Sequence, residues 1–383
     1  MKFIYFSHPE IETLYPLRKR DSLVPLQSLM GKPVGARVLQ QVQNLGFEEV
    51  LVAFPGSHEL LEYVKPPARI APIEWSQEAA RALASLISTI DDEFFVLQLG
   101  SAIAGPEVYA SVISRWNETS RSTLLLVPYS PGEDVVGVHS VRYEVDLARK
   151  VIRGVCIGGQ RGLYFSGIMI SDKRLASELS ERRSILEAIV SFSSKDDCDF
   201  HVWSGSISAV NSPFNLLSTV KELLSATREA IISTEARISP TAVIEGVVVI
   251  ERDAIVDHYC VIKGPAFIGR GALVGAHSFV RSYVSVEPGA VVGSGAEVKR
   301  SYIGPRAVVG SQCHITDSVI GDAALLRPMC VTLNYDPREA ARGAVFVKRG
   351  SVIGEKALIN GGSVLQPKCV VEPESFFDAE RAR

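Results

Sequence analysis

An aliphatic residue recurs every six residues along the second half of the chain, and this repeat restricts the fold more than any other feature. Starting at Ile238, eleven successive positions in steps of six are Ile or Val, and the last of them is Val298. The position four residues after each of them is mostly small, and alanine is the commonest choice. A period of six fits neither an α-helix nor a single strand. It indicates a solenoid built from short repeated units.

Each hexad is expected to form one short strand and a turn, so that three hexads close a triangular coil. The aliphatic residue then points into the coil, and the small residue fits its corner. The pattern shifts by one residue twice and resumes after a polar stretch, which predicts a left-handed parallel β-helix over 236–376 with an insertion loop at 326–345. Stacked coils pair their backbone groups with each other, so only the two ends stay exposed. Cys260, Cys313 and Cys369 hold small-residue positions and are expected to be packing thiols.

The first 232 residues alternate β-branched or aromatic runs with helical patterns. Strands are expected at 2–6, 48–54, 93–99, 122–129 and 199–203, and helices at 33–46, 57–64, 76–89, 174–193 and 212–232. This alternation predicts a doubly wound, Rossmann-like α/β domain over 1–232. Two runs after residue 134 suggest an antiparallel excursion. The helix at 212–232 is expected to link the domain to the β-helix.

The charge and the apolar content exclude several classes of protein. The net charge of −3 gives no electrostatic reason to expect nucleic acid or an anionic membrane as a partner. No apolar run approaches the roughly 18 residues of a membrane span. The N-terminal residues are typical of a first strand, not of a signal peptide, so we expect a cytoplasmic protein. No two of the six cysteines are in CxxC spacing, and no metal site is predicted from them.

Short segments in both halves point to one family. LYPL (14–17) and LVPLQSLMGKPV (23–34) open the chain, VNSPFNLL (210–217) closes the first domain, and VRSY (280–283), EVKRS (297–301) and LNYD (333–336) lie in the repeat. With an α/β domain before a hexapeptide-repeat β-helix, they resemble the sugar-1-phosphate nucleotidyltransferases that carry an acyltransferase-like tail. That family includes the bifunctional N-acetylglucosamine-1-phosphate uridylyltransferase/glucosamine-1-phosphate acetyltransferase and archaeal two-domain relatives.

The resemblance implies a ligand, cofactors and an assembly. The ligand would be a sugar phosphate or a nucleotide sugar. Any retained activity would use Mg²⁺ and a nucleoside triphosphate, or acetyl-CoA. The assembly would be a homotrimer formed through the flat sides of the β-helix, or a hetero-oligomer with an active paralogue.

The segment that matches the family's phosphate-binding loop, HPEIET (8–13), lacks the residues that such a loop needs. It contains no glycine, and Pro9 has no amide N–H to donate. Glu10 and Glu12 would repel a triphosphate. Thr13 stands where the resemblance implies an arginine. We therefore expect this loop to have lost its nucleotide-binding role.

The two metal-binding aspartates that the resemblance implies are also replaced. The first position is Ser101, after the strand at 93–99, and the second is Ala209, before the segment at 210–217. Without these carboxylates Mg²⁺ has no obvious protein ligand. Nucleotidyl transfer is therefore expected to be largely lost.

The acyltransferase-like half keeps more of the pattern. Arg281 and Lys299 each follow an inward aliphatic residue, so both should point outward from neighbouring coils, where they could hold a phosphate. Asn334 and Tyr335 lie where the family contacts its sugar. Solvated surface charge and a structural turn are the alternative interpretations of these four residues.

The catalytic base of this half is the open question. The family uses a histidine, and Ser311 stands at its position. A serine hydroxyl is too weak a base for that role. His314 stands where a tyrosine is expected, and His277 is another candidate that should face outward. His314, His277 and Ser311 are thus the candidate catalytic residues, and ordinary surface residues are the alternative.

Three functions stay open. The first is a nucleotidyltransferase-family protein that binds a sugar 1-phosphate or nucleotide sugar, with its nucleotidyltransferase motifs largely lost. The second is a catalytically inactive regulatory or scaffold paralogue. The third is an acyltransferase that acts on an amino-sugar phosphate through the β-helix.

Overall fold

The computed structural model describes residues 1–20, 22–74, 78–128, 134, 136–158, 162–195, 197–205, 207–335 and 348–378. The chain divides into two compact units. The sheet unit comprises Met1–Thr13, Leu23–Gln27 and Pro33–Asn211. The coil unit comprises Leu14–Ser22, Ser28–Lys32 and Ser212–Arg383, so two N-terminal segments belong with the second half of the chain.

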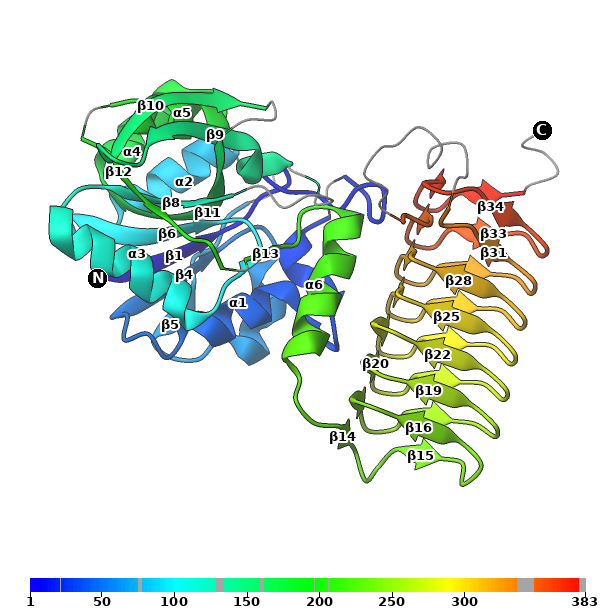
Figure 1. Ribbon diagram of the computed structural model, residues 1–383. Helices are drawn as coiled ribbons and strands as arrows, with labels where there is room; N and C mark the ends of the chain where they lie inside the picture. The colour runs from blue at the N-terminus through cyan, green and yellow to red at the C-terminus, as the bar shows by residue number, and fades with distance from the viewer. Residues whose placement is uncertain are drawn as a thin grey trace. The chain divides into compact units, whose positions relative to one another are not determined.

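The sheet unit is built on a nine-stranded mixed sheet (Figure 1). Its strands are β1 (Lys2–Phe6), β4 (Glu49–Ala53), β5 (Ala68–Ile70), β6 (Phe94–Leu99), β8 (Thr123–Val127), β9 (Val141–Asp146), β10 (Val151–Ile157), β11 (Leu163–Asp172) and β12 (Asp199–Val202). The main path runs β10-β9-β11-β6-β1-β4-β5, while β8 pairs with β11 and β12 pairs with β8. A small sheet of β7 (Ala102–Ile103) and β13 (Ser208–Ala209) lies outside this path.

The parallel sheet expected from the alternation is present in β6-β1-β4-β5, which run parallel to one another. The antiparallel excursion is also present, as the β9-β10 hairpin. The sequence patterns missed β11, which runs antiparallel to both β6 and β8. Nine of its ten residues are buried, so it has no period-two alternation of the kind that reveals a half-exposed strand.

Helices flank both faces of this sheet. They are α1 (Val34–Val42), α2 (Ala79–Ser88), α3 (Pro106–Thr119), α4 (Arg174–Glu181) and α5 (Ile185–Ser193), with 3₁₀ turns at Val24–Leu26, Ser57–Tyr63 and Gly137–Ser140. One hydrophobic core joins Ile4 and Phe6 of β1 to α2, α4 and α5. The other joins Phe3 and Tyr5 to α1 and α3.

Several predicted helices differ from the observed ones. The helix expected over 57–64 is a 3₁₀ helix, Ser57–Tyr63, and the helix expected over 33–46 ends at Val42. The single helix expected over 174–193 is two helices, because the Ser184 hydroxyl accepts a hydrogen bond from the Glu187 N–H at 3.2 Å and starts α5 anew. The linking helix expected over 212–232 is α6 (Pro213–Ala226), which Ser212 caps by accepting from the Asn215 N–H at 3.1 Å. It ends at Ala226, because Ile231–Ile232 already form β14 of the coil unit.

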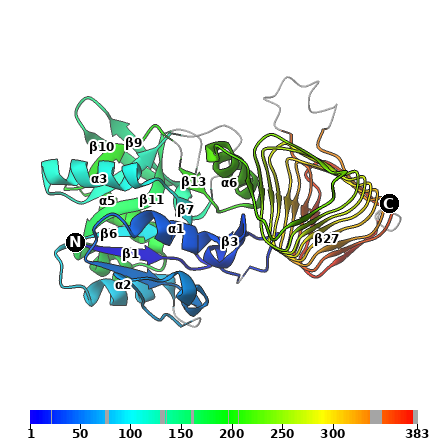
Figure 2. The same cartoon turned by 90° about the horizontal axis from the view of Figure 1, so that it is seen from below.

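The coil unit stacks short parallel strands into three sheets, an arrangement consistent with a β-helix (Figures 1 and 2). The first sheet holds β14 (Ile231–Ile232), β17 (Val248–Ile250), β20 (Ala266–Ile268), β23 (Val284–Val286), β26 (Tyr302–Ile303), β29 (Val319–Ile320), β32 (Val352–Ile353) and β35 (Val370–Val371). The second holds β15 (Arg237–Ile238), β18 (Ile255–Val256), β21 (Leu273–Val274), β24 (Val291–Val292), β27 (Val308–Val309), β30 (Leu325–Leu326), β33 (Leu358–Ile359) and β36 (Phe376–Phe377). The third holds β16 (Val243–Glu245), β19 (Val261–Lys263), β22 (Phe279–Arg281), β25 (Glu297–Lys299), β28 (His314–Thr316), β31 (Val331–Thr332) and β34 (Val364–Leu365).

The hexad residues fill the interior of these coils. From Ile250 to Val298, every aliphatic residue of the repeat is buried in one continuous core. Cys260 and Cys313 are buried there as expected, whereas Cys369 is half-buried. Strand β31 lies inside the range 326–345 that was expected to be an insertion loop, and β30 ends at its first residue. Residues 336–345 of that range lie outside the described residues.

The segment that resembles the family's opening motif has a structural role in the coil unit. β2 (Ser28–Leu29) and β3 (Lys32–Pro33) flank a tight turn in which Met30 and Gly31 have φ of 47° and 74°. The carboxylate of Glu287 accepts hydrogen bonds from the Ser28 hydroxyl at 2.6 Å, the Met30 N–H at 2.8 Å and the Gly31 N–H at 3.0 Å. Burial raises the pKa of Glu287. The MGK turn is thus anchored on the coils by a buried acid.

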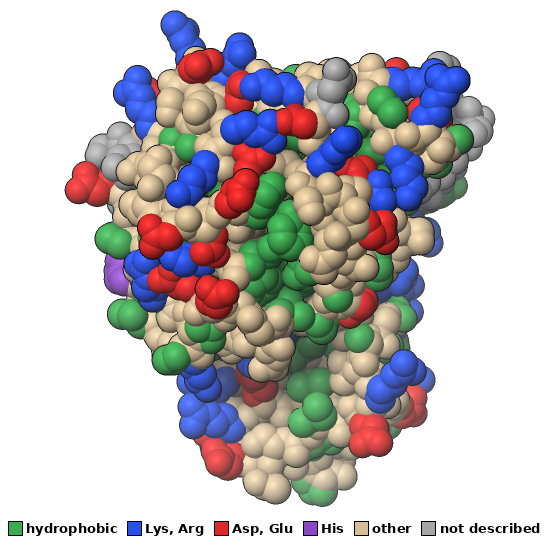
Figure 3. All heavy atoms as spheres, turned by 90° about the vertical axis from the view of Figure 1, so that its left-hand side faces the viewer, with side chains coloured by type: hydrophobic (Ala, Val, Ile, Leu, Met, Phe, Trp, Pro, Cys, Tyr) green, Lys and Arg blue, Asp and Glu red, His purple; other side chains and the backbone are tan. Residues whose placement is uncertain are grey.

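Two features of the described residues concern membrane and nucleic-acid partners. None of the described helices combines the length and the apolar content needed to cross a bilayer. On the face in Figure 3, Lys and Arg side chains are interspersed with Asp and Glu side chains. That face therefore lacks the one-sided basic surface typical of nucleic-acid binding.

Candidate functional site

The carboxyl ends of β1 and β6 mark the position, here named the Glu12 crevice, where an open α/β sheet usually binds its ligand. β1 lies between β4 and β6 in the sheet. The chain adds β4 on one side of β1 and later adds β6 on the other side, so the strand order reverses at β1. Ligands of such sheets bind at this reversal of strand order. The residues that follow the two strands are Ser7 and the pair Gly100-Ser101.

Glu12 occupies this crevice with its own carboxylate. Oε2 accepts a hydrogen bond from the Ser101 N–H at 2.6 Å, and Oε1 accepts from the Ser101 hydroxyl at 2.8 Å and from the Ser7 hydroxyl. The Tyr5 hydroxyl lies 3.0 Å from the Ser101 hydroxyl and extends the network. A backbone N–H and hydroxyl groups of this kind are the donors that a phosphate or carboxylate ligand would use. Here they bind an acidic side chain of the chain itself.

The carboxyl group of Glu12 is completely buried, and burial raises its pKa to about 7. The hydrogen bonds from Ser7 and Ser101 act in the opposite direction and favour the charged form. At neutral pH the protonated and ionised forms are therefore both populated. Burial, together with the nearby Glu12, also raises the pKa of Tyr5, which stays a neutral hydroxyl.

A second loop covers the Glu12 segment. The Val138 N–H donates to the Ile11 carbonyl at 3.2 Å, and Gly137 has a φ of 60°. A Cβ at Gly137 would lie only 2.0 Å from the Ile11 oxygen, so only glycine fits. Next to it, His139 places Nδ1 3.1 Å from the Phe165 carbonyl, and burial lowers its pKa to about 4. The neutral imidazole adds no positive charge that could attract a phosphate.

The two positions matched to metal-binding aspartates lie side by side. β13 pairs with β7 so that Ala209 is opposite Ala102, and the Val210 N–H donates to the Ser101 carbonyl at 3.3 Å. The sequence matching therefore identified neighbouring positions, but neither carries a carboxylate. The nearest acid in the network, Glu12, already accepts three hydrogen bonds. No group of three or more His, Cys, Asp or Glu side chains that could hold a metal occurs among the described residues. This donor set does not suit Mg²⁺.

The third sheet of the coil unit carries the other candidate residues. Arg281 and Lys299 face each other in register on β22 and β25, as expected for neighbouring coils. Arg281 is not free to bind a ligand, however, because Glu297 accepts hydrogen bonds from its Nη2 at 2.6 Å and its Nε at 3.0 Å. Lys299 lies close to three cations, Arg300, Arg281 and Lys348. Partial burial, followed by these charges, lowers its pKa.

His314 shares the carboxylate that holds Arg281. Its Nδ1 lies 3.3 Å from Oε2 of Glu297, directly opposite on the neighbouring strand. A carboxylate at one imidazole nitrogen orients the ring and leaves the other nitrogen available to accept a proton. The sequence patterns identified His314 but missed Glu297, although EVK was part of the motif that carried the resemblance.

Asn334 is partly exposed, and its amide already donates to Oδ2 of Asp317 within the chain. The same carboxylate accepts a bidentate pair from Arg300, through Nε at 2.5 Å and Nη2 at 2.6 Å. Arg300 and Asp317 were not expected to matter. These two residues are 17 positions apart, one fewer than the three hexads of a regular coil. The pair therefore lies in the coil where the repeat shifts by one residue.

The remaining candidates lie elsewhere on the coils. His277 is at an exposed corner, stacked on Tyr259 with ring centroids 5.0 Å apart. Ser311 lies in the corner turn that precedes β28 and is exposed. Tyr335 is 47% exposed at the end of the described segment. The structure thus brings Arg281, Lys299 and His314 together on one sheet, and it gives neither His277 nor Ser311 a carboxylate partner among the described residues.

Comparisons with known proteins do not identify a family for this chain. Neither a scan against protein-family models nor a search of curated proteins gives a match.

Proposed function

We propose that this chain is a non-catalytic relative of the sugar-1-phosphate nucleotidyltransferases that acts as a regulatory or scaffold subunit in the cytoplasm. The observation that carries the proposal is the buried Glu12 carboxylate at the carboxyl ends of β1 and β6. It accepts hydrogen bonds from Ser7 and Ser101, which are the donors an incoming phosphate would need. All six cysteines are free, which fits a reducing compartment.

Electrostatics argue against nucleoside triphosphate binding in this crevice. A triphosphate would have to displace Glu12 or lie beside its charge in a site that excludes water, where like charges repel strongly. It would also lack the metal ion that normally offsets its charge, since Ser101 and Ala209 replace the expected carboxylates. We therefore propose that the chain binds a sugar phosphate on the third sheet of the coil unit, near Lys299.

The test is a pyrophosphate-release assay with several sugar 1-phosphates, the four common nucleoside triphosphates and Mg²⁺. We expect no turnover above the rate of a buffer control. Calorimetry with UDP-, dTDP- and GDP-sugars then asks whether any nucleotide sugar still binds. Turnover that Glu12→Gln abolishes and Glu10→Gln leaves intact would refute the proposal, because Glu12 would then be a working acid.

Acyl transfer is the second candidate, and the pairing of His314 with Glu297 favours it. In this alternative, His314 would take a proton from the amine of an amino-sugar phosphate, and Lys299 would bind the phosphate. Acetyl-CoA consumption with glucosamine 1-phosphate tests it. Activity that His314→Ala removes and the matched His277→Ala leaves unchanged would support this function over the scaffold role.

We also propose that the coils are left-handed and that the chain trimerises. In the second sheet, apolar residues point outward in register from coil to coil, and they are Ile255, Leu273, Val291, Val308, Leu325, Leu358 and Phe376. Phe376 is 51% exposed and Leu325 is 41% exposed. A continuous apolar column of this kind is typical of a protein–protein interface. Sedimentation equilibrium should give three times the chain mass of 41.6 kDa, and a monomer would contradict the assembly.

A further inference from the structure

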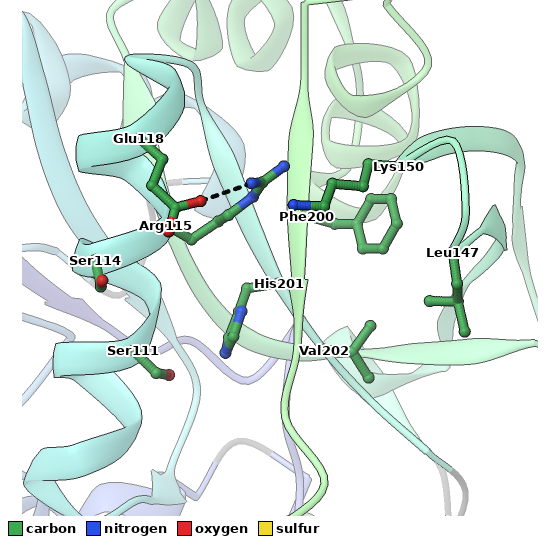
Figure 4. Close-up of a pocket in the computed structure, with 9 residues that line it drawn as sticks. All are labelled: Ser111, Ser114, Arg115, Glu118, Leu147, Lys150, Phe200, His201 and Val202. Carbon is green, nitrogen blue, oxygen red and sulfur yellow. Dashed lines mark hydrogen bonds and ion pairs between the residues drawn. The ribbon is translucent and has the colours of Figure 1, made fainter.

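A hollow of about 400 Å³ with mixed polar and apolar walls opens on the sheet unit, and none of its lining residues belongs to the Glu12 crevice. Helix α3 contributes one of its faces, the turn between β9 and β10 contributes a rim, and β12 contributes three consecutive residues (Figure 4). The lining residues are Ser111, Ser114, Arg115, Glu118, Leu147, Lys150, Phe200, His201 and Val202. A volume of this size suits a small organic molecule.

The hollow has a polar side and an apolar side because it wraps around the edge of β12. Successive side chains of a strand point to opposite faces, so Phe200, His201 and Val202 can share a cavity only around the strand's edge. Among the described strands β12 pairs only with β8, which leaves that edge open. In Figure 4, His201 points toward the serines of α3, whereas Phe200 and Val202 point toward Leu147.

The cations of the hollow differ in their availability. Arg115 is held by two carboxylates, Asp199 at 2.6 Å and Glu118 at 2.9 Å. Lys150 is exposed and has no ion-pair partner among the described residues. Its side chain passes beside Phe200, and its nitrogen points toward Arg115 (Figure 4). Lys150 is therefore the charge that a ligand can neutralise.

His201 supplies a neutral polar group. Its imidazole forms no hydrogen bond with any residue in the described part of the chain, although the side chain is partly buried. Burial first, and the nearby Arg115 second, lower its pKa, so the ring is uncharged at neutral pH. A neutral imidazole offers one donor and one acceptor to a ligand.

We propose that this hollow binds a small carboxylate that carries an aliphatic chain, with the carboxylate at Lys150 and His201 and the chain against Leu147, Phe200 and Val202. The inference is independent of the proposed function, because it uses none of the residues around Glu12 or on the coils. Leu147 is 65% exposed without a ligand, and a bound aliphatic chain would cover it.

Saturation-transfer NMR on the full chain tests this with hexanoate as the probe, with hexanol and hexylamine as comparisons, and with inorganic phosphate added as a competitor. A ligand of this size should bind in the millimolar range. We expect hexanoate to bind more tightly than hexanol and hexylamine, and phosphate at an equal concentration to displace little of it. Lys150→Met should weaken hexanoate by about fivefold, while Lys65→Met, which removes an exposed lysine elsewhere on the sheet unit, should leave it unchanged.

Leu147→Ser provides a second variant, because an exposed turn residue can be changed without disturbing the core. It should weaken the binding of hexanoate and of hexanol, because both place their aliphatic chain against Leu147. Equal binding of hexylamine and hexanoate would overturn the proposal, as would equal effects of the two lysine variants. Absence of saturation transfer to hexanoate at any accessible concentration would also overturn it.

Discussion

Replacing Glu12 with glutamine should make the sheet unit more stable at alkaline pH. The folded state holds this carboxyl with a pKa of about 7, compared with 4.5 for a solvated glutamate. A raised pKa means that the folded chain binds more protons than the unfolded chain between these values. The contribution of Glu12 is therefore fully present below pH 4.5 and is lost as the pH rises to about 7. This difference between the two pKa values corresponds to about 3 kcal/mol in the free energy of unfolding.

Glutamine should imitate the protonated acid. Its oxygen can accept from the Ser101 N–H, and its amide can donate to the hydroxyls of Ser7 and Ser101, which rotate to accept. At pH 5 the variant should be more stable than the wild type by only about 1 kcal/mol. At pH 8 the variant should be more stable by about 3 kcal/mol.

The assay is urea unfolding followed by tryptophan fluorescence at pH 5 to 8. All three tryptophans, Trp75, Trp116 and Trp203, lie in the segment Pro33–Asn211 of the sheet unit, so the signal reports on that unit. The quantity to compare is the difference in the free energy of unfolding between the variant and the wild type. His139 adds its own pH dependence to both proteins, because its lowered pKa makes the folded state more stable as the pH rises to about 6.5. Glu10→Gln is the matched control, since that side chain is 47% exposed. A pH-independent difference between Glu12→Gln and the wild type would refute the reasoning.

Three further substitutions test local packing. Gly137→Ala should lower the free energy of unfolding, measured by thermal unfolding, by about 2 kcal/mol or more, because the new Cβ would clash with the Ile11 oxygen at a positive φ. Gly158→Ala is the control and should cost less, because Gly158 also has a positive φ but has open space around it. Asp317→Ala should cost about 3 kcal/mol in the free energy of unfolding of the coil unit, because it leaves Arg300 and Asn334 without their shared acceptor; a neutral result would show that this network is dispensable. Ser184→Ala should cost about 1 kcal/mol through loss of the α5 cap, and Ser184→Asp should retain most of the stability.

The coil unit could be predicted from the sequence because its signal is local and repeated. Every hexad places an aliphatic residue at the same point of the coil, so errors at single positions do not hide the period. The side-chain pairs on the coils were harder to predict. Glu297 and His314 are opposite each other only because the repeat loses one residue between their strands, and a strict 18-residue coil would have put other residues together.

The Glu12 crevice could not be predicted, because it depends on which strand ends meet. The sequence indicated that Glu12 would repel a phosphate. It did not indicate that Ser101, 89 residues away, would donate hydrogen bonds to the Glu12 carboxylate. Helix α3 was missed for a different reason. Only Val108, Tyr109 and Val112 are buried along its length, so its apolar period is too short to recognise.

The most direct test of the account is whether the Glu12 crevice behaves as an anion site once its own carboxylate is removed. Glu12→Ala deletes a group with the shape of acetate, so we predict that added acetate binds this variant and raises its midpoint of thermal unfolding. The wild type, whose crevice already holds Glu12, should show no such shift at the same acetate concentration. Equal responses of the two proteins to acetate, or saturable binding of a Mg²⁺–nucleotide to the wild type in this crevice, would contradict the account.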